Sequence, residues 1–76
     1  MQIYNRLQLV RTERGLSRQE LAEAADVNVQ TIGFIERGDY SPSLELAFKL
    51  AHALETGIEQ VFSDKTFPTL FKKEGE

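Results

Sequence analysis

The chain has 76 residues, of which 9 are Lys or Arg and 12 are Asp or Glu, so its formal net charge is -3. This length allows one domain with a small core, the lack of cysteine excludes disulfides and thiolate metal sites, and the acidic balance argues against a nonspecific nucleic-acid binder. No apolar run approaches the roughly 18 residues of a membrane span and the first residues lack a signal-peptide pattern, so we expect a soluble cytoplasmic protein without membrane association.

The first helix is expected over residues 5–14. Leu7 and Val10 recur there at helical spacing, and Gly15 follows at the position where a left-handed residue commonly ends a helix. Positive charge is concentrated in this region, because four arginines fall within the first 18 residues: Arg6, Arg11, Arg14 and Arg18. Such a cluster suits a phosphate backbone, although solvated surface charge without a partner explains it equally simply.

The next two helices are predicted by the residues at their ends. Ser17 and Glu20 form the capping box of a helix that we expect over residues 17–25. A two-residue turn follows, and Asn28 is a suitable N-cap for a third helix over residues 28–37. Two short helices joined in this way hold the second one out from a small domain, which is the shape that enters a DNA major groove.

The rest of the chain completes an all-α, compact five-helix bundle. A fourth helix is expected over residues 43–55 with Pro42 in its first turn, and a one-turn or two-turn fifth helix over residues 58–62. Apolar periodicity fades beyond that point. We therefore divide the chain into a helix-turn-helix domain at residues 1–63 and a C-terminal tail at residues 64–76.

The third helix has two sides of different character. At about 100° per residue, Ile32 and Ile35 fall on the side that meets the core. The other side carries Val, Gly and Phe, where a simple surface helix would carry Lys, Glu or Gln. The residues that we expect to read base edges are Asn28, Val29, Gln30, Gly33 and Phe34. Gln30 suits adenine, and Val29 and Phe34 suit thymine methyl groups, unless the tail or another protein covers them instead.

Three stretches resemble the Cro/repressor-type, or XRE, helix-turn-helix family in order and spacing: LSRQELA at residues 16–22, TIGFIERG at residues 31–38 and SPSLELA at residues 41–47. The resemblance covers about residues 7–62 and implies a lambda-repressor-like fold. It also implies that Arg11 pairs with Glu36 as a structural bridge. The positions that it places near the DNA backbone are Arg18, Thr31, Arg37, Tyr40 and Ser43.

The chain departs from the family pattern at two places. Asp26 stands at the turn position that usually holds glycine, and its carboxylate would repel a nearby phosphate. Gly33 and Phe34 stand where relatives often place polar base-reading residues. These departures affect the identity of the DNA site more than the fold.

A homodimer is expected because one short recognition helix reads only a few base pairs, so such domains usually bind palindromic double-stranded DNA as two-fold dimers. The candidate dimerisation residues are Ile58, Val61, Phe62, Phe67, Leu70 and Phe71. The alternative is that these side chains only cover the core of their own chain. Some short members of the resembling family also pair strands near the two termini, and residues 2–4 and 62–67 could do likewise.

The expected function is that of a sequence-specific DNA-binding transcriptional regulator, a repressor, acting at the prokaryotic or phage nucleoid. No enzyme is expected, since His52 is the only histidine and no phosphate-binding loop or metal-ligand spacing occurs. No catalytic residue, metal or cofactor is therefore assigned. The alternative is a protein-interaction module, such as an antitoxin, which would explain the acidic charge and the apolar side of the third helix.

Overall fold

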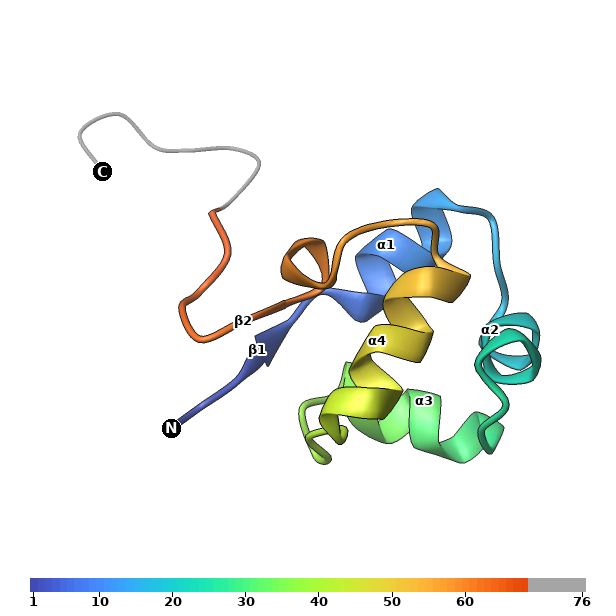
Figure 1. Ribbon diagram of the computed structural model, residues 1–76, viewed down its shortest axis with the longest axis horizontal. Coiled ribbons are helices and arrows are strands. Elements are labelled where there is room, and N and C mark those ends of the chain that lie inside the picture. The colour runs from blue at the N-terminus through green and yellow to red at the C-terminus, as the bar shows by residue number, and fades with distance from the viewer. Residues whose placement is uncertain (69–76) are drawn as a thin grey trace.

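The structure of the protein is a computed structural model that describes residues 1–68. Its elements follow one another in the order β1 (Tyr4–Asn5), α1 (Leu7–Glu13), α2 (Arg18–Ala25), α3 (Val29–Glu36), α4 (Leu44–Ala53), the 3-10 turn η1 (Ile58–Gln60) and β2 (Phe62–Ser63). The four α-helices lie together, and the two strands lead away from them on one side (Figure 1). None of these helices is long and apolar enough to cross a membrane.

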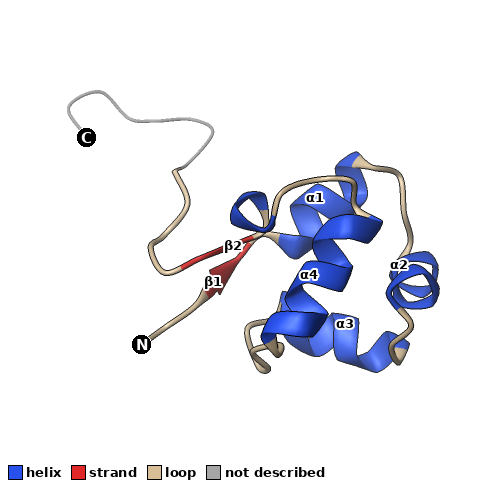
Figure 2. Ribbon diagram, in the orientation of Figure 1, coloured by secondary structure: helices blue, strands red, loops and turns tan. Residues whose placement is uncertain are grey.

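The prediction of a fifth α-helix is wrong. Residues 58–62 were expected to form one or two helical turns, but only Ile58–Gln60 is helical, as a single 3-10 turn. Phe62 instead belongs to β2, where its backbone pairs with Asn5. A helix cannot continue through a residue whose backbone is extended in a strand, so the described fold has four α-helices and a two-stranded sheet (Figure 2).

The sheet joins the start of the chain to the segment after α4. Its strands are antiparallel, with Tyr4 opposite Ser63 and Asn5 opposite Phe62. This is a pairing of the kind considered for residues 2–4 and 62–67, although it is centred closer to α1. The sheet also explains why α1 begins at Leu7 instead of residue 5: Asn5 is in the strand, and its Oδ1 accepts the Leu7 N–H at 3.0 Å.

The helix starts of α2 and α3 follow the predicted signals. Ser17 Oγ accepts the Glu20 N–H at 3.0 Å while Glu20 Oε1 accepts the Ser17 N–H at 2.8 Å, so the capping box is confirmed. The backbone and hydroxyl hydrogen bonds from Ser17 lower the pKa of the Glu20 carboxyl below its usual value. Asn28 caps α3, because its Oδ1 accepts the Gln30 N–H at 2.8 Å.

The ends of α4 differ from the prediction. Ser43 is the N-cap, its Oγ accepting the Leu46 N–H at 3.1 Å, so Pro42 lies before the helix and not in its first turn. At the other end, Glu55 takes the left-handed conformation with a φ of 57°. Gly57 has an ordinary φ of -75°. The helix therefore ends at Ala53, two residues before the expected end at residue 55.

The core lies where the four helices meet. Ile32 and Ile35 are fully buried in it, as their predicted side of α3 requires. The buried cluster contains Leu7, Leu21, Ala22, Ala25, Ile32, Ile35, Leu50, Leu54 and Val61. Since Val61 follows η1 and also belongs to this cluster, the core closes only after the chain has returned to the start of α1.

Candidate nucleic-acid interface

The α2–α3 pair has the geometry of a helix-turn-helix. The turn depends on Asp26, which adopts the left-handed conformation (φ 57°, ψ 51°) at the position where the family usually has glycine. In Figure 1, α2 is seen nearly end-on while α3 runs across the view along the lower edge of the molecule. One side of α3 packs on the core, and its other side is not covered by any element of residues 1–68. The third helix is therefore placed to enter a groove.

The five expected base-reading residues occupy three different environments. Gln30 is exposed, and Phe34 is 46% exposed, so both present their side chains outward. Asn28 is exposed, but its carbonyl oxygen is engaged in the helix cap. Val29 is half-buried and packs against the core, while Gly33 is enclosed. The side chains that face outward from α3 are thus fewer than helix arithmetic suggested.

Arg37 accounts for the enclosure of Gly33. Its guanidinium lies across the glycine, where a Cβ would approach the Arg37 Nη1 to 3.3 Å. The same group stacks over the Phe34 ring, with 5.1 Å from the guanidinium carbon to the ring centroid. Its Nε–H donates to Asp39 Oδ2 at 3.1 Å. Arg37 is therefore held on three sides at the end of α3.

These groups line one shallow hollow on the outward side of α3. Its walls are formed by Arg18, Val29, Gln30, Gly33, Phe34 and Arg37. The hollow combines an amide that can donate and accept hydrogen bonds, an aromatic surface and two guanidinium groups at its edges. Base edges with methyl groups, flanked by phosphates, offer complementary chemistry.

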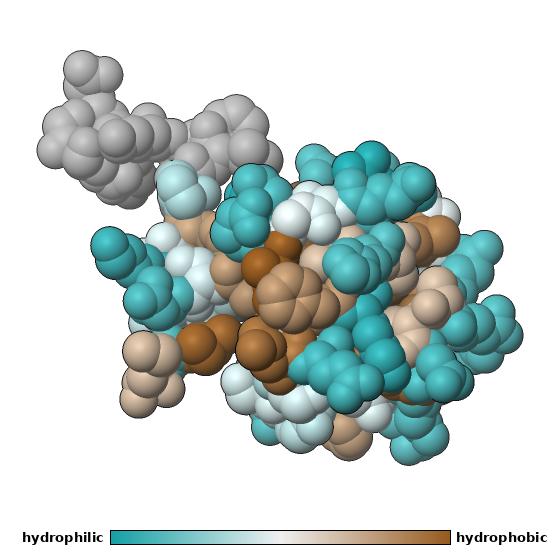
Figure 3. All heavy atoms as spheres, in the orientation of Figure 1, coloured by the Kyte–Doolittle hydropathy of each residue, from teal (hydrophilic) through white to brown (hydrophobic). Residues whose placement is uncertain are grey.

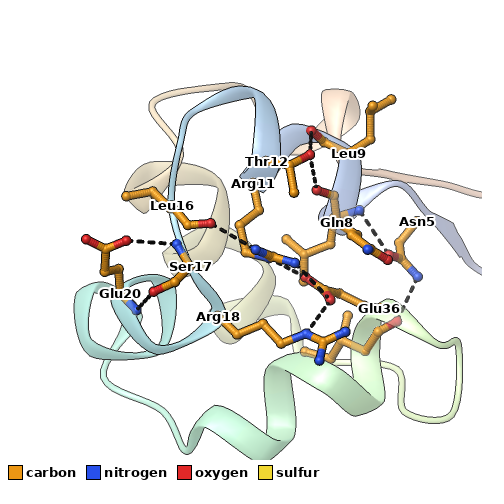
Figure 4. A network of polar contacts seen from close by, with 12 residues as sticks. Asn5, Gln8, Leu9, Arg11, Thr12, Leu16, Ser17, Arg18, Glu20 and Glu36 are labelled. Atoms are coloured by element: carbon orange, nitrogen blue, oxygen red, sulfur yellow. Dashed lines mark hydrogen bonds and ion pairs between the residues drawn. The ribbon is translucent and has the colours of Figure 1, made fainter.

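A buried carboxylate ties three helices together behind this hollow. Glu36, whose side chain is 1% exposed, accepts the Arg11 Nε–H at 2.6 Å and the Arg18 Nε–H at 2.8 Å. Arg11 also donates from Nη1 to the Leu16 carbonyl oxygen at 2.8 Å. Figure 4 shows Glu36 between the two arginines, one from α1 and one from the start of α2. The expected Arg11–Glu36 pair is present, and Arg18 shares its carboxylate.

The expected backbone-contacting residues are distributed over the start of α2, α3 itself and the segment that leads to α4. Arg18 is tethered to Glu36 but keeps 47% of its side chain exposed. Tyr40 is 48% exposed, and Ser43 is exposed at the start of α4. Thr31 is half-buried and lines a second hollow with Phe34, Asp39 and Tyr40.

The expected dimerisation residues do not form one exposed group. Val61 is 0% exposed in the core of its own chain, and Ile58 and Phe62 are half-buried. Phe67 lies over the guanidinium of Arg6, 4.5 Å from ring centroid to guanidinium carbon. Leu70 and Phe71 lie outside the described residues.

Arg6 fastens the C-terminal segment to the start of α1. Its Nε–H donates to the Gln60 carbonyl oxygen at 2.7 Å, and its Nη2 donates to Gln60 Oε1 at 3.1 Å. The N-terminal arginines thus have different tasks, since Arg6 binds the C-terminal segment, Arg11 pairs with the buried Glu36 and Arg18 borders the hollow of α3.

Sequence reasoning missed a structural residue next to the interface. Asn5 donates from Nδ2 to the carbonyl oxygen of Ile35 at 2.9 Å, which attaches β1 to the last turn of α3. The prediction began the first helix at residue 5 and so treated Asn5 as a helix residue. Assigning residues 4 and 5 to a strand would have left the Asn5 side chain available for this contact.

An exposed apolar patch was also missed. Leu44 is 70% exposed and Phe48, one turn later on α4, is 43% exposed. Figure 3 shows brown side chains gathered over α4 and toward the sheet on this face. The spacing of Leu44 and Phe48 is the signal that could have revealed the patch, since residues four apart share one face of a helix.

The described residues offer no obvious metal centre. Within residues 1–68, no three His, Asp or Glu side chains are grouped so that they could hold a metal ion. His52 is exposed on α4, where its ring lies 6.2 Å from that of Phe48.

Comparison with known proteins gives a consistent family. The sequence profile of HTH_3, described as Helix-turn-helix, matches residues 7–61. The chain is 40% identical over 57 residues to an HTH-type transcriptional regulator of Archaeoglobus fulgidus, covering 75% of this chain and 81% of the relative. It is 51% identical over 53 residues to another HTH-type transcriptional regulator, from Methanothermobacter thermautotrophicus, covering 68% of this chain and 77% of that relative.

Solved structures agree with the sequence matches. The restriction-modification controller protein C.AhdI from Aeromonas hydrophila superposes with a TM-score of 0.70 at 36% identity, covering 72% of this chain and 83% of that one. The clp gene regulator ClgR from Corynebacterium glutamicum gives 0.68 at 34% identity, covering 70% and 56%. With its α2–α3 geometry, its matched residues and these relatives, the chain belongs to the XRE-type HTH_3 helix-turn-helix family of transcriptional regulators.

Proposed function

We propose that the protein is a sequence-specific DNA-binding transcriptional regulator that inserts α3 into the major groove. The observation that carries this proposal is the hollow on the outward side of α3, where Gln30 and Phe34 lie between Arg18 and Arg37. Membership of a family of transcriptional regulators also supports the proposal. The chemistry proposed for the site is recognition without catalysis, and it needs no cofactor.

Direct reading of bases falls mainly to Gln30 and Phe34. The Gln30 amide can accept from adenine N6 and donate to adenine N7, and the Phe34 ring can contact a thymine methyl group. Val29 contributes apolar surface at the base of the hollow, and Asn28 stands at its entrance. Gly33 allows the Arg37 guanidinium to lie close against the helix.

Positioning on the DNA backbone falls to groups around this centre. Arg18, Thr31, Tyr40 and Ser43 are the candidates, and Arg18 supplies the charge. Net charge of -3 does not oppose this arrangement, because the group of Arg11, Arg18 and Glu36 holds two positive charges against one negative charge and so keeps one positive charge beside the hollow. The surface that meets DNA can thus be positive on an acidic protein.

A dimeric repressor is the form of regulator that we propose. Residues 1–63 would bind one half-site, and residues 64–76, with Phe67, Leu70 and Phe71, would join two copies on a palindromic operator. Two recognition helices one DNA turn apart multiply the sequence information that a single α3 can read. Occupation of such an operator would block transcription from an overlapping promoter in the prokaryotic nucleoid.

A salt series tests the proposal. Fluorescence anisotropy with DNA selected from a random pool should give binding whose logarithmic affinity falls linearly with the logarithm of salt concentration. Arg18→Ala should weaken binding to all sequences and flatten this slope by about 0.9 for each phosphate that the variant no longer neutralises. Arg14→Ala is the charge-matched control, because Arg14 lines a different hollow with Arg6 and Thr56 and should leave the slope unchanged. Absence of binding to any fragment at low salt would refute DNA recognition.

Protein binding is a second candidate function, favoured by the exposed apolar pair of Leu44 and Phe48 on α4. Exposed apolar surface of this kind commonly marks an interaction site. A protein partner on α4 would leave α3 free, so the two functions are separable. Leu44→Ser should abolish such an interaction without altering DNA affinity.

A further inference from the structure

We propose that Arg37 reads a guanine base instead of contacting the DNA backbone. The inference rests on the proposed function and deepens it, because it assigns a specificity-determining residue on the same surface. Resemblance to the family places this position near the phosphates. The contacts of Arg37 in this chain point to a different task.

The Arg37 guanidinium is oriented by two neighbours. Asp39 Oδ2 accepts the Nε–H at 3.1 Å, and the guanidinium carbon lies over the Phe34 ring, 5.1 Å from its centroid. Within residues 1–68, the two terminal amino groups donate no hydrogen bond. These contacts engage Nε and the Phe34 ring and leave the two terminal amino groups for a ligand.

This arrangement suits guanine better than phosphate. Guanine presents O6 and N7 side by side in the major groove, and a guanidinium fork meets both acceptors at once. A phosphate can also take both arms of the fork, but the Asp39 carboxylate beside the guanidinium offsets the positive charge that would attract it. Asp39 has 62% of its side chain exposed, so it would itself face any phosphate drawn to Arg37.

The position of the guanidinium also places the guanine relative to adenine. Arg37 follows Gln30 by seven residues, so both lie on one face of the helix. The Arg37 side chain leans back over Gly33, and Nη1 lies within 3.3 Å of where a Cβ would stand there. Gly33 and Gln30 are separated by about 4.5 Å along the axis. Since base pairs are about 3.4 Å apart, the guanine should lie one or two base pairs from the adenine.

Selection of sites from a random DNA pool tests this assignment, using the full chain and three variants. The wild-type sites should contain a guanine at a fixed position next to the adenine that Gln30 reads. Arg37→Ala removes every donor that could reach guanine O6 and N7. It should lower discrimination for that guanine by about tenfold to a hundredfold and leave the other base preferences unchanged.

Asp39→Ala tests whether Asp39 orients the Arg37 guanidinium for guanine. It leaves Arg37 intact but releases Nε, so discrimination for the guanine should fall while affinity for unrelated DNA rises with the loss of a negative charge. Arg14→Lys is the control and should select the wild-type site. Circular dichroism of each variant verifies the helical fold.

The outcomes distinguish this inference from the function on which it rests. If the wild type selects a site but Arg37→Ala keeps every base preference, Arg37 is not a base reader and DNA recognition by α3 still holds. If Asp39→Ala changes affinity without changing the guanine preference, the orienting role of Asp39 is wrong. If the wild type selects no DNA at all, the proposed function fails and the guanine assignment fails with it.

Discussion

Glu36 illustrates how much of this small domain depends on single residues. Its carboxylate is 1% exposed and accepts hydrogen bonds from Arg11, which is also buried, and from Arg18, which is half-exposed. Removal of one member of a buried ion pair leaves the other charge without compensation, and this is far more damaging than loss of a surface pair. The network therefore sets the placement of α3 through its C-terminal turn.

Glu36→Ala should lower the free energy of unfolding by about 3–5 kcal/mol. Arg18→Ala should lower it by less than about 1 kcal/mol, because the Arg18 side chain is half-exposed and Arg11 still compensates the Glu36 charge. Urea denaturation followed by circular dichroism measures both. Asp39→Ala, which breaks an exposed pair, is the control and should change stability little. Equal losses for Glu36→Ala and Asp39→Ala would show that burial of the network does not matter.

Gln30→Ala should weaken binding to the selected site by about 1–3 kcal/mol and remove the preference for adenine at one position. The reason is that a bidentate amide contact to adenine has no substitute in an alanine. Anisotropy titrations with the selected site and with variants at each base pair measure the effect. Gln19→Ala is the control, since Gln19 is exposed on α2 and bonded to Glu23. An unchanged base preference would mean that another face of the protein reads DNA.

At the scale of elements, local signals were sufficient where a side chain caps its own helix. Ser17, Glu20 and Asn28 act within three residues of their position, so their roles could be read from the sequence. The same holds for Ile32 and Ile35, whose burial follows from helical periodicity. These predictions needed no knowledge of distant parts of the chain.

The wrong predictions depend on contacts across the chain. The fifth helix fails because Phe62 pairs with Asn5, 57 residues earlier in the sequence (62 minus 5). Likewise, the enclosure of Gly33 depends on the direction of the Arg37 side chain, which Asp39 and Phe34 set. Helix arithmetic fixes which face a residue occupies, but it does not say which neighbours lie over that face.

At two helix ends, replacing the present residue by glycine should stabilise the fold. Asp26 after α2 and Glu55 after α4 both have a φ of 57°, a conformation that L-residues adopt at a penalty. Asp26→Gly and Glu55→Gly should each raise the free energy of unfolding by about 0.5–1 kcal/mol, after the greater freedom of glycine in the unfolded chain is subtracted. Thermal denaturation measures the gain.

The same two variants separate stability from recognition. Asp26→Gly also removes a negative charge from the helix-turn-helix, so it should raise DNA affinity as well as stability. Glu55→Gly removes the same charge beyond α4 and should raise stability alone. Equal changes in DNA affinity for Asp26→Gly and Glu55→Gly would show that the turn between α2 and α3 lies away from the DNA phosphates.

At the scale of the whole molecule, the core closes within the described residues, while the proposed dimer needs the tail. A chain that ends at residue 68 keeps Val61 in the core and Phe67 over Arg6. It lacks Leu70 and Phe71. We expect it to fold as the full chain does but to sediment as a monomer at concentrations where the full chain is a dimer, and to bind a palindrome more weakly than the full chain.

Sedimentation velocity over a range of concentrations measures this prediction. Leu70→Ser with Phe71→Ser in the full chain is the matched variant, because it removes the apolar groups and keeps the length. Dimers that persist in both variants would place the interface elsewhere, and the exposed pair of Leu44 and Phe48 would be the next surface to alter.

The central claim is that α3, and not the apolar face of α4, meets DNA. Chemical-shift mapping of the ¹⁵N-labelled protein with its selected DNA site tests it most directly. We predict that the largest shifts occur in α3, at Gln30, Gly33 and Phe34, and at Arg37 beside it, while Phe48 and His52 on α4 are unaffected. Largest shifts at Phe48 and His52, or no shifts at α3 under conditions where DNA binds, would contradict the account.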